Sequence, residues 1–344
     1  MAALSGLAVA ALLLAANAGA QPAPEAAGTV TLVAVGDIRL DGPFGDAARR
    51  RGMKAPTDGV RAALAGDIVH GNLECALTRR GQAADKKYTF KAPAGNAAIL
   101  RAAGFTHVTL ANNHVMDFGA AGMRDTLEAL RAAGIQPVGA GADAAAAAAP
   151  VFIERNGLRI GMLAVTSTLP EDIRAGAAKP GVAYSDVRLL KEQVREAKRR
   201  CDILIASYHG GTELSQTPNP VQEEIFGLLL DGGADVVIGH HPHVLQPIRS
   251  EHGRLALFSL GNFLFVSPTP GTQWTVIARL RLSRTQLAAE FVPLEIGPGR
   301  FLPAGPYGRE LIKDALDPTG TLLLWDEESA VFRLRAPLDL GGRK

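Results

Sequence analysis

Apolar runs of strand length, each ended by polar residues, constrain this chain more than any other feature. Residues 29–35 form a nearly continuous apolar run that stops at Gly36 and Asp37, and comparable runs stop near Asn112, His209 and His240. Continuous hydrophobicity is typical of strands that are buried on both faces, as in parallel sheets. The polar residues therefore mark loops at the carboxyl ends of strands, where open α/β sheets place their functional sites.

Helical patterns separate several of these runs. We predict helices at 97–103 with Gly104 as C-cap, 122–133, 187–200 and 221–230, and strands between them at 106–111, 202–207 and 234–238. An Asn156-Gly157 turn predicts a hairpin, and three further strands follow at 255–260, 275–282 and 288–294 without intervening helices. The fold class is therefore α/β, a layered sandwich with mixed sheets.

Length, charge and the N-terminal segment limit the possible domain organisation and partners of the chain. The 344 residues are 47% hydrophobic and carry a formal net charge of +2, so charge gives no reason to expect a nucleic-acid partner. Residues 1–20 lack charge and end in Ala18-Gly19-Ala20, which indicates an export signal or an uncleaved membrane anchor. We predict that leader at 1–20, a linker at 21–28, one domain at 29–296 and a C-terminal appendage at 297–344. The protein would then be exported, periplasmic or extracellular, and anchored if the leader stays.

Five of the eight histidines lie in three short clusters. The clusters are Asn112-Asn113-His114 with Asp117, His209 with Glu213, and His240-His241-Pro242-His243, while Asp37 and Glu74 supply carboxylates nearby in the pattern. This set of donors suits Mn²⁺, Zn²⁺, Fe or Mg²⁺. Two metals bridged by a carboxylate can clamp a phosphoryl group and make hydroxide at neutral pH. We predict a site for one or two divalent ions, with His241 and His243 pointing the same way on an extended backbone stiffened by Pro242.

Each of these residues also has a plain structural interpretation. Asp37 can cap a turn, Asn72 and Asn113 can occupy left-handed turns, and Asp117 can cap the helix that begins near Gly119 as readily as act in chemistry. His209 alone can be a satisfied buried histidine. His70, His107 and His252 have no clustered partners, and we assign them no role. The stretch 86–91, rich in lysine, either presents cations to an anionic substrate or forms a solvated edge strand.

A family resemblance rests on motifs in a fixed order. They are Gly36-Asp37, Gly71-Asn72-Leu73-Glu74, residues 88–93, Asn112-Asn113-His114 with Asp117-Phe118-Gly119, residues 239–247 and residues 259–263. From about residue 30 to 265 the chain resembles the bacterial capsule-synthesis CapA family, which is associated with poly-γ-glutamate production. The fold of that family is similar to calcineurin-like metallophosphoesterases, which implies an α/β/β/α order of layers.

The resemblance also implies roles. The metal ligands would be Asp37, Glu74, Asn113, His209, His241 and His243, with His240 able to exchange roles with His241. His114 would contact substrate and protonate the leaving group, with Asp117 beside it in the catalytic pair. Substrate contacts would come from Asn72, Asn112, Glu213, His240 and Asn262. The chain departs from the phosphoesterase pattern at Arg39, where the Asp-x-His motif has histidine, at Asn72 and Glu74, where an aspartate is usual, and at Gly210, where the family usually has tryptophan.

Two functions follow as hypotheses. The first is a metal-dependent, phosphoesterase-like hydrolase of the cell envelope that acts on an anionic polymer or a small phosphoester. The second is a non-catalytic accessory protein that binds or guides an anionic polymer such as poly-γ-glutamate, in contact with membrane-bound capsule synthesis machinery. Arg39 in place of a ligand favours the second, and the clustered donors favour the first.

Overall fold

The computed structural model describes residues 28–341. The predicted leader at 1–20 and nearly all of the linker at 21–28 lie outside the described residues. Within the described part, no helix is both long and apolar enough to cross a bilayer.

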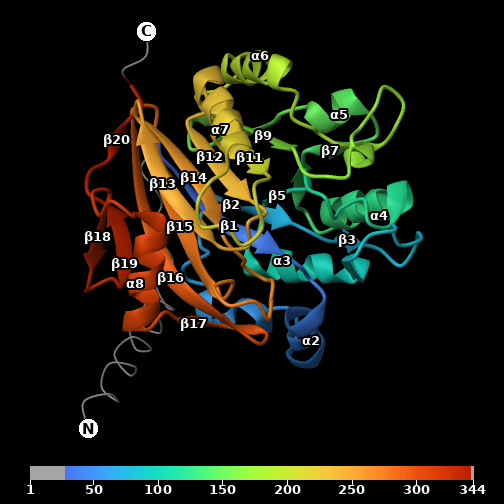
Figure 1. Ribbon diagram of the computed structural model, residues 1–344, viewed down its shortest axis with the longest axis horizontal. Coiled ribbons are helices and arrows are strands. Elements are labelled where there is room, and N and C mark those ends of the chain that lie inside the picture. The colour runs from blue at the N-terminus through green and yellow to red at the C-terminus, as the bar shows by residue number, and fades with distance from the viewer. Residues whose placement is uncertain (1–27, 342–344) are drawn as a thin grey trace.

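Two mixed sheets form the centre of the molecule (Figure 1). The first has the strand order β18 (Leu323–Asp326), β19 (Val331–Leu334), β16 (Gln286–Gly297), β15 (Trp274–Leu282), β1 (Val30–Ile38), β2 (Ile68–Leu73), β5 (His107–Thr109) and β6 (Gln136–Val138), with β17 (Arg300–Pro303) and β20 (Leu338–Asp339) also paired to β16. The second has the order β13 (Leu245–Glu251), β14 (Arg254–Leu260), β12 (Val236–His240), β11 (Ile203–His209), β9 (Leu158–Thr166) and β8 (Val151–Arg155). Two small sheets pair β3 (Ala76–Leu77) with β4 (Lys91–Ala92) and β7 (Ala140–Gly141) with β10 (Gly181–Val182).

Helices cover the outer faces of both sheets. The α-helices are α2 (Gly42–Arg51), α3 (Ala97–Ala103), α4 (Gly119–Ala132), α5 (Ala144–Ala148), α6 (Val187–Lys198), α7 (Pro220–Gly232) and α8 (Pro306–Leu316), and short 3₁₀ turns lie at η1 (Ala55–Val60), η2 (Ala94–Asn96) and η3 (Glu171–Ile173). Figure 1 shows α6 and α7 beside β11 and β12, with α3 and α4 beside the first sheet.

The alternation of buried side chains confirms the layered α/β architecture. Along β1, Leu32 and Ala34 pack in the core between the two sheets, whereas Val33 and Val35 face the core under α3 and α4. Along β11, Ile203 and Ile205 face the inter-sheet core, whereas Leu204 and Ala206 face α6 and α7. Because side chains alternate along a strand, each sheet buries both faces, and the order is helices, sheet, sheet, helices.

Each sheet contains both parallel and antiparallel pairs. β1, β2, β5 and β6 run parallel, as do β9, β11, β12 and β14, whereas β15, β16, β13 and β8 pair antiparallel to their neighbours. The hairpin at Asn156-Gly157 joins β8 to β9 as predicted, and Gly104 ends α3 in a left-handed conformation. The segment after residue 297 adds β17, β18, β19 and β20 to the first sheet.

Two local regions differ from what the sequence suggests. Of the two alternatives for residues 86–91, the edge strand is limited to Lys91 at the start of β4, because residues 86–90 run as an irregular loop held by the segment carrying Asp117. The backbone around Pro242 is not extended either, since β12 ends at His240 and both His241 and His243 have positive φ angles of 96° and 60°. Left-handed backbone is uncommon for residues other than glycine, and it occurs where the surroundings dictate it, often at functional sites.

Candidate metal centre

The candidate site lies where the carboxyl ends of the central parallel strands of both sheets meet. Asp37 on β1 pairs with Asn72 on β2 in the first sheet, and His209 on β11 pairs with His240 on β12 in the second. Glu74 follows β2 directly. The functional side chains therefore come from separate strands and project into the end of the inter-sheet layer.

A close approach of two chain segments shapes the floor of the site. A Cβ atom on Gly36 would lie 1.9 Å from the carbonyl oxygen of Gly261, so only glycine fits there. The Asp37 N–H donates to Gly261 O at 2.9 Å, and the Phe263 N–H donates to Asp37 O at 2.7 Å. This strand-like pairing brings Asn262 beside Asp37.

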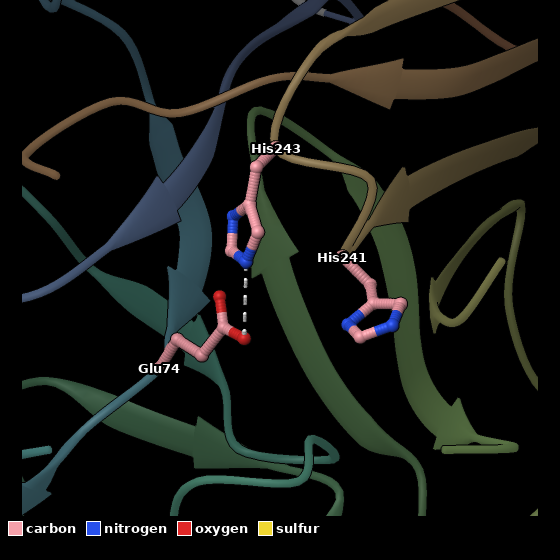
Figure 2. Close-up of side chains that lie close together, drawn as sticks. All are labelled: Glu74, His241 and His243. Carbon is pink, nitrogen blue, oxygen red and sulfur yellow. Dashed lines mark ion pairs between the residues drawn. The ribbon is translucent and has the colours of Figure 1, made fainter. Parts of the chain in front are cut away.

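Glu74 is at the centre of the donor cluster. Its side chain is fully buried, and neither carboxylate oxygen accepts a hydrogen bond from the described residues. Three imidazole nitrogens nevertheless approach Glu74 Oε1: His209 Nε2 at 3.4 Å, His243 Nε2 at 3.9 Å and His114 Nε2 at 4.0 Å. Figure 2 shows Glu74 between the chain after β2 and the His241–His243 loop, with His243 and Glu74 joined as an ion pair.

Two overlapping sets of ligand atoms share Glu74. One comprises Glu74, His241 and His243, and the other Asp37, Glu74 and His209, with the ligand atoms of each set within 4.8 Å of one another. The Asn113 amide oxygen lies 3.0 Å from His209 Nε2 and adds a neutral oxygen donor. Ligands that share one ion at bonds of about 2.0–2.2 Å lie roughly 3–4 Å apart, so the separations of 3.4 Å and 3.9 Å from Glu74 Oε1 to His209 Nε2 and His243 Nε2 fit a divalent cation. A buried carboxylate without hydrogen bonds is costly unless it is paired or coordinates metal, and this fits as well.

Electrostatics separate the two carboxylates. Burial raises the pKa of Glu74 to about 7, and its histidine neighbours offset part of that shift. Burial acts on Asp37 in the same direction, but the contacts with His240 and His243 outweigh it and hold its pKa well below the usual range. Asp37 is therefore the stable anion, whereas Glu74 is a strained one that a cation would stabilise.

The pKa values of the site histidines are also shifted in opposite directions. Burial lowers the pKa values of His209 and His241 well below the ordinary histidine value, so both rings are neutral and able to coordinate. Burial would also lower the pKa of His243, but the neighbouring Glu74 and Asp37 raise it to about 9. A cation bound at Glu74 would displace that proton, because metal ligands must be deprotonated.

Asp37 is already well supplied with donors. Oδ1 accepts from Asn72 Nδ2 at 2.9 Å and lies 3.3 Å from His240 Nδ1. Oδ2 accepts from the His241 N–H at 3.1 Å and lies 3.2 Å from His243 Nδ1. The carboxylate thereby organises the His240–His243 loop, in addition to any ligand role.

His114 and Asp117 form a hydrogen-bonded pair at the edge of the site. His114 Nδ1 lies 2.8 Å from Asp117 Oδ2, which leaves Nε2 facing Glu74. The same oxygen accepts from the Phe90 N–H at 2.6 Å, and Lys86 Nζ lies 2.5 Å from Asp117 Oδ1. Phe118, rather than Asp117, is the N-cap residue of α4, so the carboxylate of Asp117 is committed to the site.

Four residues predicted to contact substrate are buried beside the donor cluster and make hydrogen bonds or close contacts within the protein. Asn72, Asn112, Asn262 and His240 are at most 1% exposed, and their contact with substrate stays a prediction. Asn112 donates to Asn72 Oδ1 at 2.9 Å and accepts from the His114 N–H, and Asn262 Oδ1 lies 2.9 Å from His243 Nδ1. They hold ligands and loops in place. Glu213, by contrast, is exposed in the loop after β11.

Arg39 lies outside the donor cluster. Its guanidinium group packs 4.6 Å from the Phe90 ring centre and 5.0 Å from that of Phe265, and Nε pairs with Asp41 at 2.5 Å. Phe90 in turn stacks on His114, and Phe265 contacts His243. Arg39 thus packs against Phe90 and Phe265, the two aromatic rings that contact His114 and His243, and it does not occupy the position of a metal ligand.

Sequence reasoning missed two contributors. His70 and Ser207 are buried, and the His70 Nε2 and Ser207 Oγ atoms lie 3.1 Å apart. The signal was present in the period-two pattern, since His70 precedes Asn72 by two positions and Ser207 precedes His209 by two. The sequence identifies Lys86 as a cation. Its contact with Asp117 could not be predicted, because the two residues are far apart in the chain and share no local pattern.

Comparison with known proteins identifies relatives. Residues 31–267 match the family model described as bacterial capsule synthesis protein PGA_cap. The "PGA biosynthesis protein CapA" of Bacillus subtilis is 32% identical over 236 residues, which cover 67% of this chain and 62% of that protein. The "Capsule biosynthesis protein CapA" of Bacillus anthracis is 31% identical, covering 89% of this chain and 77% of that protein. A "probable polyglutamine synthesis accessory protein" of Mycobacterium tuberculosis is 31% identical, covering 73% and 72%.

Solved structures with similar topology include the NAD nucleotidase of Haemophilus influenzae, with a TM-score of 0.49, 13% identity and coverage of 86% of this chain and 57% of that one. A putative 5′-nucleotidase from Staphylococcus aureus aligns with a TM-score of 0.47, 16% identity and coverage of 86% and 59%. The sequence matches do decide the family: with two thirds of its length matched, the chain belongs to the bacterial capsule synthesis protein family.

Proposed function

We propose that this protein is a metal-dependent hydrolase of the cell envelope that acts on an anionic polymer, with poly-γ-glutamate or a phosphoester-containing polymer as the substrate class. The observation that carries the proposal is Glu74: a fully buried carboxylate without hydrogen bonds, approached by imidazole nitrogens from three separate segments. The names of its relatives support the link to capsule polymers.

The chain's own residues would hold the ion and orient the substrate. Two sets that share Glu74 would supply the ligands: Glu74, His241 and His243 in one, and Asp37, Glu74 and His209 in the other. The Asn113 amide oxygen lies beside His209 and adds a neutral donor. These oxygen and imidazole donors suit Mn²⁺, Zn²⁺, Fe or Mg²⁺. When bound, such an ion polarises the scissile group and lowers the pKa of a water.

His114 is the group placed to handle the leaving-group proton. Asp117 Oδ2 accepts the Nδ1 hydrogen of the ring, so Nε2 faces the site and can exchange a proton with substrate. Lys86 and the Phe90 N–H hold Asp117 in that position. Loss of a positioned acid of this kind typically costs 10²–10⁴-fold in rate.

A second function has its own support. Asp37 is surrounded by protein donors, and Arg39 contributes to an aromatic wall rather than to the ligand set. These features favour an accessory protein that binds an anionic polymer at the membrane-bound synthesis machinery without cleaving it. Under either function the partner is an anion, and nucleic acid is not expected at a net charge of +2.

One experiment separates the two. Purified protein is analysed for bound metal by mass spectrometry, then incubated with poly-γ-glutamate and with generic phosphodiesters, with and without added Mn²⁺ or Zn²⁺. Turnover that is lost in Glu74→Gln and on chelation supports the hydrolase, and saturable binding of polymer without turnover supports the accessory role. His252→Asn is the matched control, because His252 is an exposed histidine whose φ of 51° suits asparagine. Turnover that survives both chelation and Glu74→Gln would exclude the metal site as its source.

A further inference from the structure

A row of buried polar side chains runs behind Asp37 and joins the two sheets. His240 Nδ1 lies 3.3 Å from Asp37 Oδ1, His240 Nε2 lies 3.3 Å from Ser207 Oγ, and Ser207 Oγ lies 3.1 Å from His70 Nε2. Ser207 and both histidines are at most 2% exposed. His70 belongs to β2 in the first sheet, whereas Ser207 and His240 belong to neighbouring strands of the second. The row therefore crosses the inter-sheet layer, whose other members are mostly aliphatic.

The anion at one end favours one set of directions for the contacts in the row. Asp37 accepts from Asn72 and from the His241 N–H, so His240 Nδ1, which faces it at 3.3 Å, is better placed with a proton than with a lone pair, although this contact lacks hydrogen-bond geometry. With a single proton on the ring, His240 Nε2 carries a lone pair, and the Ser207 hydroxyl lies 3.3 Å away to donate to it. The Ser207 oxygen is left to accept from His70 Nε2–H. This leaves a lone pair on His70 Nδ1, which accordingly has no hydrogen-bond partner in the described structure.

We propose that Ser207 and His70 are positioning residues for the candidate metal centre: through one row of buried polar contacts they fix the ring of His240 and, with it, the orientation of the Asp37 carboxylate. The inference rests on the proposed function, because the expected effect of losing Ser207 or His70 is a weaker affinity for the metal ion. Asp37 receives the backbone of His241 and the ring of His243, so a carboxylate rotated about its own axis would shift both histidines relative to Glu74.

The magnitude follows from the behaviour of residues that orient metal ligands. Removal of such partners typically weakens metal binding by 10–100-fold. Ser207→Ala removes the hydroxyl and leaves one donor and one acceptor unpaired, so both metal affinity and stability are expected to fall. Ser207→Thr keeps the hydroxyl and is expected to restore the affinity. Thr126→Ala is the matched control, since it removes a fully buried hydroxyl from α4, where Thr126 contacts Gly122 O and Leu77 N and no site residue.

The decisive readout is the position of the ring protons. In ¹⁵N-labelled, metal-free protein, nitrogen chemical shifts distinguish a protonated ring nitrogen from one with a lone pair. We expect His240 to carry its proton on Nδ1 and His70 on Nε2 in the wild type, with that pattern lost for His240 in Ser207→Ala and unchanged in Thr126→Ala. A wild-type His240 that carries its proton on Nε2 would overturn the proposal.

Titration calorimetry with Mn²⁺ and Zn²⁺ completes the test. A 10–100-fold weaker Kd in Ser207→Ala, restored in Ser207→Thr and unaltered in Thr126→Ala, supports the positioning role. An unchanged Kd in a folded Ser207→Ala refutes it and leaves the row as a structural link between sheets. If the wild type binds neither ion, the proposed function fails, whereas the nitrogen shifts still decide the row of buried polar contacts.

Discussion

Replacing Glu74 by glutamine is expected to make the metal-free protein more stable while removing its response to metal. Glu74 is fully buried, and burial raises its pKa from the ordinary value of 4.5 to about 7. A group whose folded pKa is raised in this manner is an acid that the folded state prefers protonated. The contribution of Glu74 to the free energy of unfolding is favourable or neutral below pH 4.5 and declines as the pH rises from 4.5 to 7. Above pH 7 the buried charge lowers the stability by its full amount.

The size of the penalty follows from the shift. A difference of 2.5 pKa units, from 4.5 to about 7, corresponds to about 3 kcal/mol at pH 8, at roughly 1.4 kcal/mol per unit. This value already includes the attraction between Glu74 and His243. Glutamine has nearly the same shape and no charge to bury, so Glu74→Gln should recover most of that energy.

Urea unfolding at pH 8 in the presence of a chelator measures the gain, and the same titration with Mn²⁺ at about 100 times its Kd measures the response to metal. The wild type should gain about 2.7 kcal/mol from that excess of ligand, and Glu74→Gln should gain little. The difference of about 3 kcal/mol seen in chelator would then shrink to near zero in Mn²⁺. A glutamine variant that is less stable than the wild type in chelator, or that gains as much from Mn²⁺, would refute the role assigned to Glu74.

Three further predictions concern separate parts of the structure. Burial lowers the pKa of His107 to about 4, so the unfolded chain binds more protons than the folded one between pH 4 and 6.5; the wild type should lose about 3 kcal/mol across that fall in pH, and His107→Gln should flatten this part of a urea midpoint against pH profile. Gly36→Ala should cost about 3 kcal/mol or more in thermal or urea unfolding, because the added methyl would lie 1.9 Å from Gly261 O, and an unchanged midpoint would show that the contact relaxes freely. Asp117→Asn should leave metal content intact but lower kcat on any substrate that is turned over by 10-fold or more, because the charged oxygen that orients the His114 ring is replaced by a neutral amide; equal kcat values would remove His114 from the proton step.

Sequence patterns predicted the layers and most of the elements for a clear physical reason. Buried strands such as β1 and β11 are continuous apolar runs, and α3 ends at a glycine that adopts the left-handed conformation a C-cap needs. Clustering of histidines and carboxylates likewise pointed to strand ends that do meet. These patterns lie within short stretches of sequence, and the structure of such a stretch follows its local preference.

Predictions failed where the outcome depends on contacts between distant segments. The turn at His241 and His243 is dictated by the Asp37 carboxylate some two hundred positions earlier in the chain, and no propensity at Pro242 reveals it. The supporting roles of Asn72 and Asn262 depend on full burial, which is decided by the packing of both sheets. Residue type alone cannot distinguish an amide that contacts substrate from one that holds a ligand.

The interleaved course of the chain also orders its assembly. The second sheet is formed from residues 151–260, between the portions of the chain that build the two sides of the first sheet, and Asn262 reaches Asp37 only after that insertion is complete. During synthesis, Asp37 and Glu74 emerge long before the histidines that surround them, so the candidate ligand set is incomplete in any nascent chain shorter than about 243 residues. A metal ion at this centre would consequently be bound late in synthesis, and its binding would require that both sheets have come together.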